Sequence, residues 1–417
     1  MEYKTLSLAE LNAIVANAED IQEGVVIKDY SVDQASDKML GFLGDYWRLK
    51  VELVTSENDT LHKIFFIKAI SKSNAAKADM VRDMNLFEKE SWFYNVMVKK
   101  MTNNGLKPWS SRFITSTNEA MVFEDLNALQ YENRDKFEVY DEEHILLALN
   151  TLARFHASSI ILEEENSRRI QKPYFINDKY LLDKGGYKTN NTWFEQCMKG
   201  ALEIVTTMSK YRNDAKALQQ IENKWSKVWY RSLEITETSN KYRNVICHRD
   251  LWNNNIMFRY ENVNNTVKVV DCLFVDFAAV SLQPPASDVM LLFYCTLDPV
   301  FREQNLNYFI HYYYEQLKIN LSTNGIAIEN IISFRDFIES CEEQRLWGVI
   351  VSACLVPQFW ISEELTKKIF CNTEDFEKIL NNDKATFIKT MINNNEGYKR
   401  KILPIFEEIV HRYCLTP

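Results

Sequence analysis

Three polar residues past the middle of the chain have the types and the spacing that phosphoryl transfer from ATP requires. The segment His248–Asn255 places Asp250 five residues before Asn255, and Asp276 follows a hydrophobic run. A carboxylate at 250 can accept the proton of an attacking hydroxyl, and oxygens of Asn255 and Asp276 can bind the Mg²⁺ that holds nucleotide phosphates. The sequence therefore predicts a phosphotransferase centre with Asp250 as base and Asn255 and Asp276 as metal ligands.

The hydrophobic run before Asp276 carries much of this prediction. An H-x-D-x-x-x-x-N pattern alone is weak, because the consecutive residues Asn253–Asn255 also suit turns and helix caps. The runs Val267–Val270 and Leu273–Val275 read as a strand that delivers Asp276 out of apolar surroundings. A carboxylate in such a place is costly without a metal ion or a cationic partner.

A strand and a helix nearer the N-terminus supply a candidate for that cation. Lys68 lies on the predicted strand Lys63–Ile70, and the segment from Met80 to Lys99 is predicted to be helical. That helix offers Glu90, with Glu88 as the competing candidate. A strand lysine paired with a helix glutamate aims its ammonium at the α and β phosphates of ATP. The alternative is that Lys68 is a solvated lysine of a long strand.

The loop that would cover the phosphates is less well marked. Gly41 and Gly44 precede the predicted strand Tyr46–Val54, but a full G-x-G-x-x-G is absent, and both glycines also suit an ordinary turn. If this loop covers ATP, backbone N–H groups make most of the phosphate contacts. A further strand, Ala120–Leu126, contains Glu124 at the expected junction of two lobes, where adenine is bound mainly through main-chain groups.

Length and composition fit a two-lobed enzyme. The chain has 417 residues, more than one typical domain, so we expect a nucleotide-binding lobe over 1–126 and a catalytic and substrate-binding lobe over 127–417. Hydrophobic residues make up 46% of the chain, which argues against extensive disorder. The formal net charge is -9 and the basic residues are scattered, which argues against a nucleic-acid surface.

The cysteines and the apolar segments favour a cytoplasmic protein that does not insert into a membrane. The eight cysteines form no C-x-x-C pair and read as buried thiols. The N-terminus lacks the continuous apolar core of a secretory signal. The apolar run Leu346–Val356 is followed by Pro357 before it reaches membrane-spanning length, so we expect a buried helix. An amphipathic helix over Ile145–Ile161 carries His156, which we expect to be a core histidine.

Several segments together resemble the insect ecdysteroid kinase-like family, a branch of the aminoglycoside- and choline-kinase-like enzymes. The most specific one has a Trp two residues after Asp250 and an Asn-Ile-Met-Phe ending. The similarity extends from the small-lobe strands to the region of Trp347. The segments that carry it are Val245–Phe258, Val275–Phe277, Pro285–Asp288, Leu152–Ala157 and Phe123–Leu126.

This resemblance implies an ATP- and Mg²⁺-dependent small-molecule kinase with an α+β, bilobal, protein-kinase-like fold, a small β-rich N-lobe and a larger, mainly helical C-lobe. The position matching Asp288 is implied to steady the catalytic loop. Two departures stand out, since the family usually has Gly where this chain has Arg249, and Gln is common in the segment Phe277–Ala279. No D-F-G or A-P-E follows, so a protein substrate is not expected.

Two functions remain in view. The first is an active kinase for a hydroxyl of an apolar small molecule, such as an ecdysteroid or a xenobiotic metabolite, and the second is a catalytically silent relative that binds a ligand. The presence of Lys68 together with Asp250, Asn255 and Asp276 favours the active kinase, because a binding protein needs none of them. We expect Trp252 to line the acceptor pocket. Downstream aromatics at helical spacings are further candidates for its walls, although most of them are expected in the core: Phe293, Tyr294, Tyr308, Tyr312, Tyr313, Trp347, Phe359 and Trp360. The sequence contains no pattern that predicts an oligomeric state.

Overall fold

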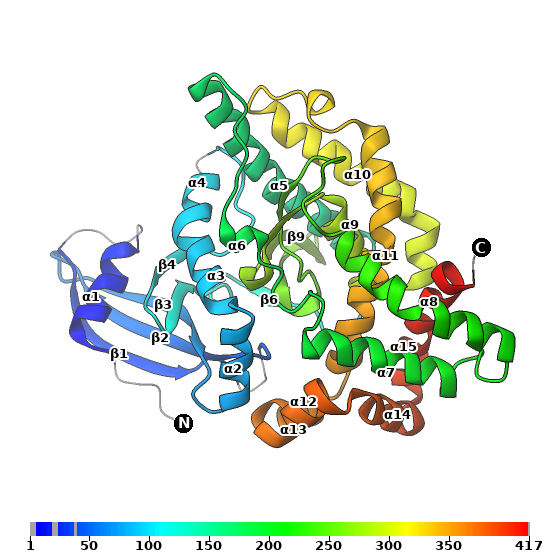
Figure 1. Ribbon diagram of the computed structural model, residues 1–417. Helices are drawn as coiled ribbons and strands as arrows, with labels where there is room; N and C mark the ends of the chain where they lie inside the picture. The colour runs from blue at the N-terminus through cyan, green and yellow to red at the C-terminus, as the bar shows by residue number, and fades with distance from the viewer. Residues whose placement is uncertain (1–5, 19–23, 37–39, 103, 416–417) are drawn as a thin grey trace.

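The computed structural model describes residues 6–18, 24–36, 40–102 and 104–415, and it has two lobes (Figure 1). The first lobe contains one antiparallel sheet with strand order β1-β2-β3-β5-β4. The second lobe is mainly helical and carries two small sheets, which β6, β8 and β9 form in one case and β7 and β10 in the other. The expected α+β, two-lobed fold is confirmed, and the proposed boundary near residue 126 falls between β5 and β6.

The elements of the first lobe follow the alternation seen in the sequence. The helix α1 covers one face of the sheet, and its Leu11 and Ile14 share a hydrophobic core with the strands. Its elements are α1 (Leu8–Asn17), β1 (Val26–Gln34), β2 (Gly44–Val54), β3 (Thr60–Ile70), α2 (Ala75–Asp83), α3 (Leu86–Trp92), η1 (Phe93–Val98), α4 (Lys99–Met101), β4 (Phe113–Ser116) and β5 (Ala120–Glu124).

Strand β3 shows how period-two alternation positions a functional side chain. Phe65 and Ile67 are buried in the core beneath α1. Successive side chains of a strand point to opposite faces, so Lys68 points away from that core and toward the second lobe. The strand therefore separates a hydrophobic face that stabilises the lobe from a face that carries the ammonium.

The helical segment expected from Met80 to Lys99 is interrupted. Helix α2 ends before Met84, and Asn85 adopts a left-handed conformation with φ 54° before α3 begins. Asparagine tolerates this conformation better than most residues, and it lets the chain change direction. The remainder continues as α3 and a π-helical turn, η1, whose Phe93 and Tyr94 are fully buried.

The second lobe packs its helices around the core that also receives η1. Helix α5 packs on α10, and α11 lies between α9 and α15. The elements are β6 (Tyr131–Asn133), α5 (Glu142–Ile170), α6 (Lys179–Leu182), α7 (Thr192–Met208), α8 (Ala215–Glu234), β7 (Val245–Cys247), η2 (Asn253–Asn255), β8 (Ile256–Val263), β9 (Thr266–Phe274), η3 (Phe277–Ala279), β10 (Ser281–Gln283), α9 (Ala286–Thr296), α10 (Pro299–Ser322), η4 (Ile328–Asn330), α11 (Phe334–Phe359), α12 (Glu363–Cys371), α13 (Thr373–Glu377), η5 (Lys378–Asn382), α14 (Lys384–Asn394), α15 (Glu396–Ile409) and η6 (Val410–Cys414).

The expected buried helix around Leu346–Val356 is confirmed, but it is longer than the sequence suggested. Helix α11 continues through Pro357 to Phe359. By length and composition, α5 is the one single helix among the described residues that is long and apolar enough to cross a membrane, and 78% of its apolar window is buried inside the protein. The bent pair α11 and α12 passes the same test together. Seven of the eight free cysteines are buried as expected, and Cys371 is exposed.

The C-terminal segment touches the first lobe. Helices α12 and α13 lie beside α2 (Figure 1), and the Asn74 side-chain amide donates a hydrogen bond of 3.2 Å to the carbonyl of Phe370. The Thr373 hydroxyl donates to the carbonyl oxygen of the same side chain at 3.3 Å. The two lobes are therefore joined on the side of the cleft formed by the C-terminal helices as well as through the chain connection at residue 126.

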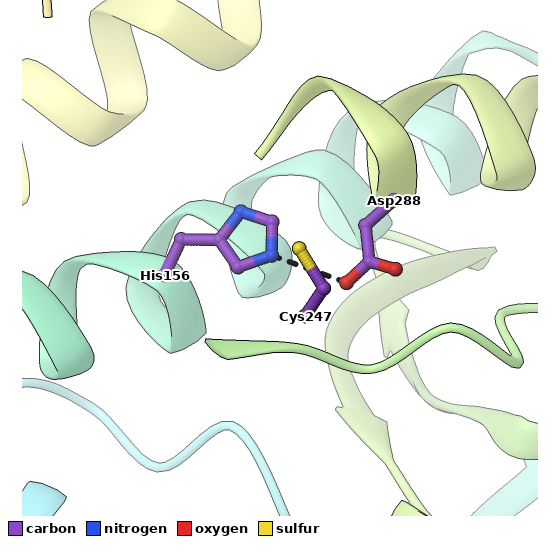
Figure 2. A group of neighbouring side chains, drawn as sticks. All are labelled: His156, Cys247 and Asp288. Carbon is purple, nitrogen blue, oxygen red and sulfur yellow. Dashed lines mark hydrogen bonds and ion pairs between the residues drawn. The ribbon is translucent and has the colours of Figure 1, made fainter. Parts of the chain in front are cut away.

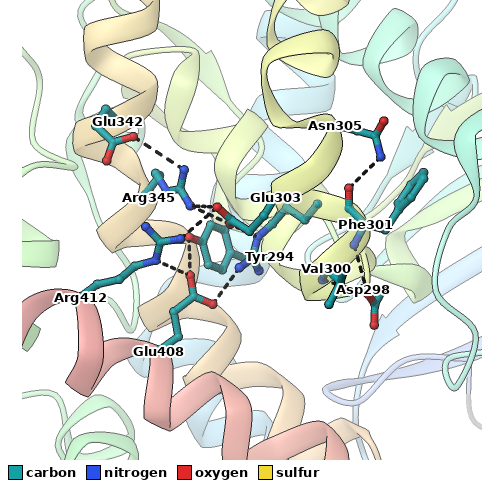
Figure 3. A network of polar contacts seen from close by, with 11 residues as sticks. Tyr294, Asp298, Val300, Phe301, Glu303, Asn305, Glu342, Arg345, Glu408 and Arg412 are labelled. Atoms are coloured by element: carbon teal, nitrogen blue, oxygen red, sulfur yellow. Dashed lines mark hydrogen bonds and ion pairs between the residues drawn. The ribbon is translucent and has the colours of Figure 1, made fainter.

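An ion network fastens the end of the chain to the helical lobe (Figure 3). Arg412 contacts Glu303 at 2.9 Å and Glu408 at 2.8 Å. Arg345 on α11 also contacts Glu303, and the Tyr294 hydroxyl donates to Glu408 at 2.9 Å. We call this set, together with Arg302, the C-terminal ion network.

Candidate active site

The segment after β7 forms a loop that holds Asp250 against Asn255. The Asn255 side-chain nitrogen donates to Oδ2 of Asp250 at 2.7 Å and to the Asp250 carbonyl at 2.9 Å. Because an amide nitrogen only donates, these contacts leave Oδ1 of Asn255 as the atom available to a cation. The three asparagines Asn253–Asn255 form the short helix η2, which fixes the position of Asn255 relative to Asp250.

The carboxylate of Asp288 anchors the backbone of this loop. Its two carboxylate oxygens accept hydrogen bonds from the backbone N–H of His248 at 2.6 Å and of Arg249 at 2.8 Å. His156 contacts the same carboxylate at 3.1 Å and the Tyr313 hydroxyl at 2.6 Å. The expected structural role of Asp288 is confirmed, and His156 is the buried, hydrogen-bonded core histidine that the sequence suggested.

His156, Cys247 and Asp288 lie close enough together to resemble a metal site (Figure 2). All three are buried, and burial raises the pKa of the Cys247 thiol well above its usual value, so the sulfur keeps its proton. Both oxygens of Asp288 already accept backbone hydrogen bonds. The chemistry of this cluster therefore fits a hydrogen-bonded support for the catalytic loop and does not fit a metal centre, which needs a thiolate.

A second loop brings Asp276 to the lysine of the first lobe. Lys68 Nζ lies 2.6 Å from Glu90 Oε2 and 2.8 Å from Asp276 Oδ1. The structure decides the choice between the two glutamates, because Glu90 is 1% exposed in this pair whereas Glu88 points to solvent. Asp276 adopts φ 65°, a left-handed conformation that is rare for a non-glycine residue and is typical of functional sites.

The carboxyl groups of the cleft have shifted proton affinities. Burial, reinforced by the nearby Asp276 charge, raises the pKa of Asp250 to about 7. Burial also raises the pKa of Glu90 to about 7, although the Lys68 ammonium opposes this shift. For Asp276 burial alone would raise the pKa, but the Lys68 charge outweighs it and the pKa lies below its ordinary value. One ammonium therefore faces three carboxyl groups in a partly desolvated cleft.

This donor set fits Mg²⁺. The carboxylate of Asp276 and the free amide oxygen of Asn255 are hard oxygen ligands, and Asp250 adds a further acid nearby. The excess of acidic groups over cations at this place also favours a bound divalent ion. Asp276 and Asn255 are therefore the residues that would hold the metal ion.

A cavity between the lobes has the position of a nucleotide site. It is lined by the Lys68 pair with Glu90, by the metal-ligand candidates, and by Glu124 at the end of β5. Gly41 also lines it, and a Cβ at that position would lie 2.1 Å from the Tyr46 hydroxyl, so a larger residue here would force the Tyr46 side chain to move. Gly44, at the start of β2, does not line this cavity; it lines the second cavity described below, and a Cβ there would meet the Ala69 carbonyl at 3.2 Å.

A second cavity of about 180 Å³ meets the first at Lys68, Asn255 and Asp276, and Asp250 lines it. Its far wall is apolar. Trp252 stacks on Phe359 with ring centroids 4.5 Å apart and an interplanar angle of 14°. The other lining residues that matter here are Phe42, Met84, Trp193, Leu355, Gln358, Phe370 and Leu380.

The sequence predicted part of this second cavity. Trp252 lines it as expected, and Phe359 does too, whereas Phe293, Tyr313 and Trp347 are buried in the core. Phe42, which stacks on Phe359 at 4.1 Å, was missed. So were Gln358 and the loop Lys184–Tyr187, because they come from segments that carry no motif. The paired glycines Gly185 and Gly186 were the available signal for that loop.

Arg249 explains one departure from the family pattern. It adopts φ 66°, a conformation that favours glycine, so a glycine at this position avoids backbone strain. The guanidinium is fully buried over the rings of Tyr187 and Trp347, 5.1 and 5.4 Å from their centroids. It also donates to the Lys184 carbonyl at 3.3 Å. The side chain thus links the loop that carries Asp250 to the loop Lys184–Tyr187, which lines the second cavity.

Comparison with known proteins gives a family match. The sequence profile of the ecdysteroid kinase-like family matches residues 38–325. No curated protein sequence matches the chain significantly.

Solved structures show only a distant likeness. The ADP-bound aminoglycoside phosphotransferase APH(2″)-Ib is 15% identical, with 83% of this chain and 99% of that chain covered and a TM-score of 0.35. The streptomycin–ATP complex of APH(2″)-IIa is 14% identical over 90% and 97% of the two chains, with a TM-score of 0.37. Choline kinase LicA from Streptococcus pneumoniae is 12% identical over 80% and 94%, with a TM-score of 0.34.

Proposed function

The chain belongs to the ecdysteroid kinase-like family, and on that premise we propose that it is a kinase that transfers the γ-phosphoryl group of ATP to a hydroxyl of an apolar small molecule. The observation that carries the proposal is the meeting of two cavities at one set of charged residues. Lys68, Asn255 and Asp276 line both cavities, whereas Asp250 lines the apolar one alone. A base between a nucleotide site and an acceptor site is what phosphoryl transfer to an alcohol requires.

Each residue has a defined part in this reaction. The Lys68 ammonium, held by Glu90, would pair with the α and β phosphates, and Asp276 and Asn255 would hold Mg²⁺. The metal ion, when bound, neutralises charge on the phosphate oxygens. Asp250 orients the acceptor hydroxyl and takes its proton, and its pKa of about 7 suits a base at neutral pH.

The lining of the second cavity favours an apolar acceptor. Cationic sugars need several converging acids to compensate the desolvation of their ammonium groups. The acids that line this cavity are Glu90, Asp250 and Asp276, all at the phosphate end. The other walls are mostly aromatic and aliphatic, with Lys184 and Gln358 as polar exceptions. Steroid-like or phenolic alcohols, including ecdysteroids and xenobiotic metabolites, fit such walls.

The buried thiols also favour a reducing compartment, and we place the protein in the cytoplasm. Its partners in this proposal are ATP and a small hydroxyl compound. Nucleic acid is not among them, in keeping with the negative net charge.

A phosphate-transfer screen tests the proposal. Purified protein is incubated with γ-labelled ATP, Mg²⁺ and steroid, phenolic, choline or aminoglycoside acceptors. Transfer to steroid or phenolic alcohols with higher kcat/KM than to the cationic acceptors is expected. Trp252→Ala should raise KM for these acceptors more than for ATP, because its ring lines the acceptor side. Transfer only to polycationic acceptors contradicts the apolar acceptor.

Thermal stability distinguishes the kinase from a silent relative. A ligand that binds the native state alone raises its stability, so ATP should raise the Tm in the presence of Mg²⁺ and much less in its absence. A protein whose Tm does not respond to millimolar nucleotide, with or without Mg²⁺, is the silent ligand-binding relative instead.

A further inference from the structure

One wall of the acceptor cavity contains a polar group that the proposed chemistry does not use. Gln358 lies near the end of α11, next to Phe359, which stacks on Trp252. The side chain is 5% exposed and lines the cavity among apolar neighbours such as Leu355 and Leu380. A buried amide costs free energy unless its hydrogen bonds are made, so its surroundings show what it is there to contact.

Two donors hold the oxygen of this amide. The Lys384 ammonium donates to Gln358 Oε1 at 2.8 Å, and the indole N–H of Trp193 donates to the same atom at 3.1 Å. An ammonium and an indole N–H have no acceptor atom, so neither can face the amide nitrogen. The amide is therefore fixed in one orientation, and the reverse orientation would place four donor hydrogens against one another.

Fixing the oxygen leaves the amide nitrogen for the cavity. Within the described residues Nε2 of Gln358 makes no hydrogen bond, although the side chain is more than nine-tenths buried. Because Gln358 lines the acceptor cavity, this N–H₂ group is a directed donor among apolar walls. A ligand that enters the cavity meets one preset donor at this wall.

Lys384 is an unusual residue for its position, which suggests that its contact has a purpose. It is the first residue of α14, where the helix dipole disfavours a cation, and it is only 1% exposed. Among the described residues no carboxylate forms a salt bridge with it. Its ammonium also donates to the Cys197 sulfur at 3.0 Å and lies over the Trp193 ring, 5.5 Å from the centroid. Burial raises the pKa of that thiol, but contacts with Cys354 and Lys384 outweigh burial and lower it to about 7. A buried lysine at the start of a helix, without a carboxylate partner, is unfavourable for stability, and such unfavourable residues are expected at functional sites.

We propose that Gln358 is a specificity-determining residue and that the acceptor carries a hydrogen-bond-accepting oxygen, as in a ketone or an ether, besides the hydroxyl that is phosphorylated. Lys384 is the positioning residue that orients the Gln358 amide. This inference rests on the proposed kinase function, because it identifies the chemical class of the acceptor of that same site. An apolar alcohol without a second oxygen leaves the Gln358 donor unsatisfied and binds more weakly.

Matched pairs of probes test the assignment by binding alone. One probe is a hydroxysteroid with a ketone on the ring most distant from its hydroxyl, and its partner has a methylene there; a phenolic pair is built in the same way. Affinity is measured without ATP by calorimetry. Wild-type protein should prefer the ketone of a pair by about tenfold, the scale of one hydrogen bond that is otherwise left unmade.

The variant Gln358→Glu separates specificity from folding. A carboxylate keeps the contacts with Lys384 and Trp193 through one oxygen, so the fold should be retained, but the other oxygen replaces the donor with an acceptor. The ketone preference should fall to about one or invert. A third probe with an amine at the same place should bind this variant more tightly than it binds the wild type, because the carboxylate accepts its hydrogens.

Lys384→Met tests the positioning role against a matched control. Without the ammonium the amide of Gln358 is free to turn, so the ketone preference should shrink while affinity for the methylene probe is kept. Lys389→Met removes a lysine of the same helix that pairs with Glu203 at the surface, and it should leave the preference unchanged. Thermal melting of both variants shows that each is folded.

The outcomes distinguish this inference from the proposed function. Three outcomes overturn the assignment, even if phosphoryl transfer occurs. The wild type binds both members of every pair with equal affinity, it binds no pair at all, or its ketone preference is retained in Gln358→Glu. A ketone preference that depends on Gln358 and Lys384, with no transfer from ATP to any acceptor, supports the assignment and contradicts the kinase function.

Discussion

Two of the protein's ion networks differ in their balance of charge. In the cleft, the single ammonium of Lys68 faces the carboxyl groups of Asp250, Glu90 and Asp276. Burial leaves two of these carboxyls with a pKa of about 7, so the group resists full ionisation. The cleft network therefore has a deficit of positive charge.

The C-terminal ion network has the opposite balance (Figure 3). The guanidinium groups of Arg302, Arg345 and Arg412 surround Glu303 and Glu408 at 2.5 to 3.1 Å. Although burial raises the pKa of Glu303, the Arg345 contacts outweigh it and lower the pKa. Every carboxylate there has its cations within the protein. The compensated network joins helices of the second lobe, whereas the uncompensated one has the charge balance that the proposed metal ion would complete.

The largest expected effect is the loss of turnover when Asp250 in the cleft is replaced. Asp250→Asn keeps the shape of the side chain and removes the base, so turnover should fall by about 10² to 10⁴. ATP affinity should be largely retained, because the base acts in the chemical step. Steady-state rates on an acceptor from the screen, with ATP binding measured by calorimetry, check this. A kcat close to that of the wild type contradicts the assignment of Asp250.

Substitutions of the two proposed metal ligands test whether the cleft binds a cation. Asp276→Ala should remove the dependence of ATP binding on Mg²⁺, and Asn255→Ala should weaken it less, because a carboxylate is the stronger ligand. A loss of about tenfold or more in MgATP affinity is expected for Asp276→Ala, the scale on which metal sites respond when supporting groups are lost. Titrations with MgATP and metal-free ATP decide. Equal metal dependence in the wild type and Asp276→Ala shows that the ion binds elsewhere.

The C-terminal ion network should respond in stability and leave the catalytic rate unchanged. Arg345→Met leaves Glu303 without its closest partner, and the free energy of unfolding should fall by about 1 to 3 kcal/mol. The side chain of Glu303 is 38% exposed, which limits the loss. Arg335→Met, on the same helix, removes an arginine whose side chain is 87% exposed and should change stability by about 0.5 kcal/mol or less.

Denaturant unfolding of the two variants, with kcat as a second readout, makes this comparison. If Arg345→Met lowered kcat while leaving stability unchanged, the C-terminal ion network would not have the purely structural role assigned to it.

The last test is the dependence of stability on pH. The folded pKa of Asp250, about 7, lies above the ordinary carboxyl value of 3.8, so the folded state binds the proton more tightly. This contribution is fully present below about pH 4 and is lost as the pH rises through about 7, by up to about 1.4 kcal/mol per pH unit for one proton. Asp250→Asn, which has no proton to lose, should show a flatter pH profile of unfolding in this range. Identical profiles rule out the shifted carboxyl.

Most of the cleft chemistry was predictable because it depends on short segments. Asp250 and Asn255 share one loop, and Asp276 follows a strand whose apolar pattern is visible in the sequence. Period-two alternation also predicted strand β3 with Lys68. The break at Asn85 was not predicted, because a single left-handed residue leaves the helical pattern of the flanking segments intact.

The acceptor side was much less predictable. Trp252 was identified because it lies close to Asp250 in the sequence, but Phe42 comes from near the start of the chain, and Gln358 and Lys384 come from two helices near its end. No local pattern connects a loop residue of the first lobe with two helices near the C-terminus. Arg249 shows the same limit, since its departure from glycine was visible in the sequence but its conformation and stacking partners were not.

The sequence by itself determined the residue types of the catalytic centre, the order of strands and helices that carry them, and the family. These properties depend on neighbours within a few residues, on strand and helix periodicity, and on the cost of burying an unpaired charge. The tertiary structure alone decided that Glu90 and not Glu88 pairs with Lys68, and that the Gln358 amide presents its donor to the cavity. Those outcomes depend on distances between segments 22 to 165 residues apart, which packing sets and local sequence does not encode.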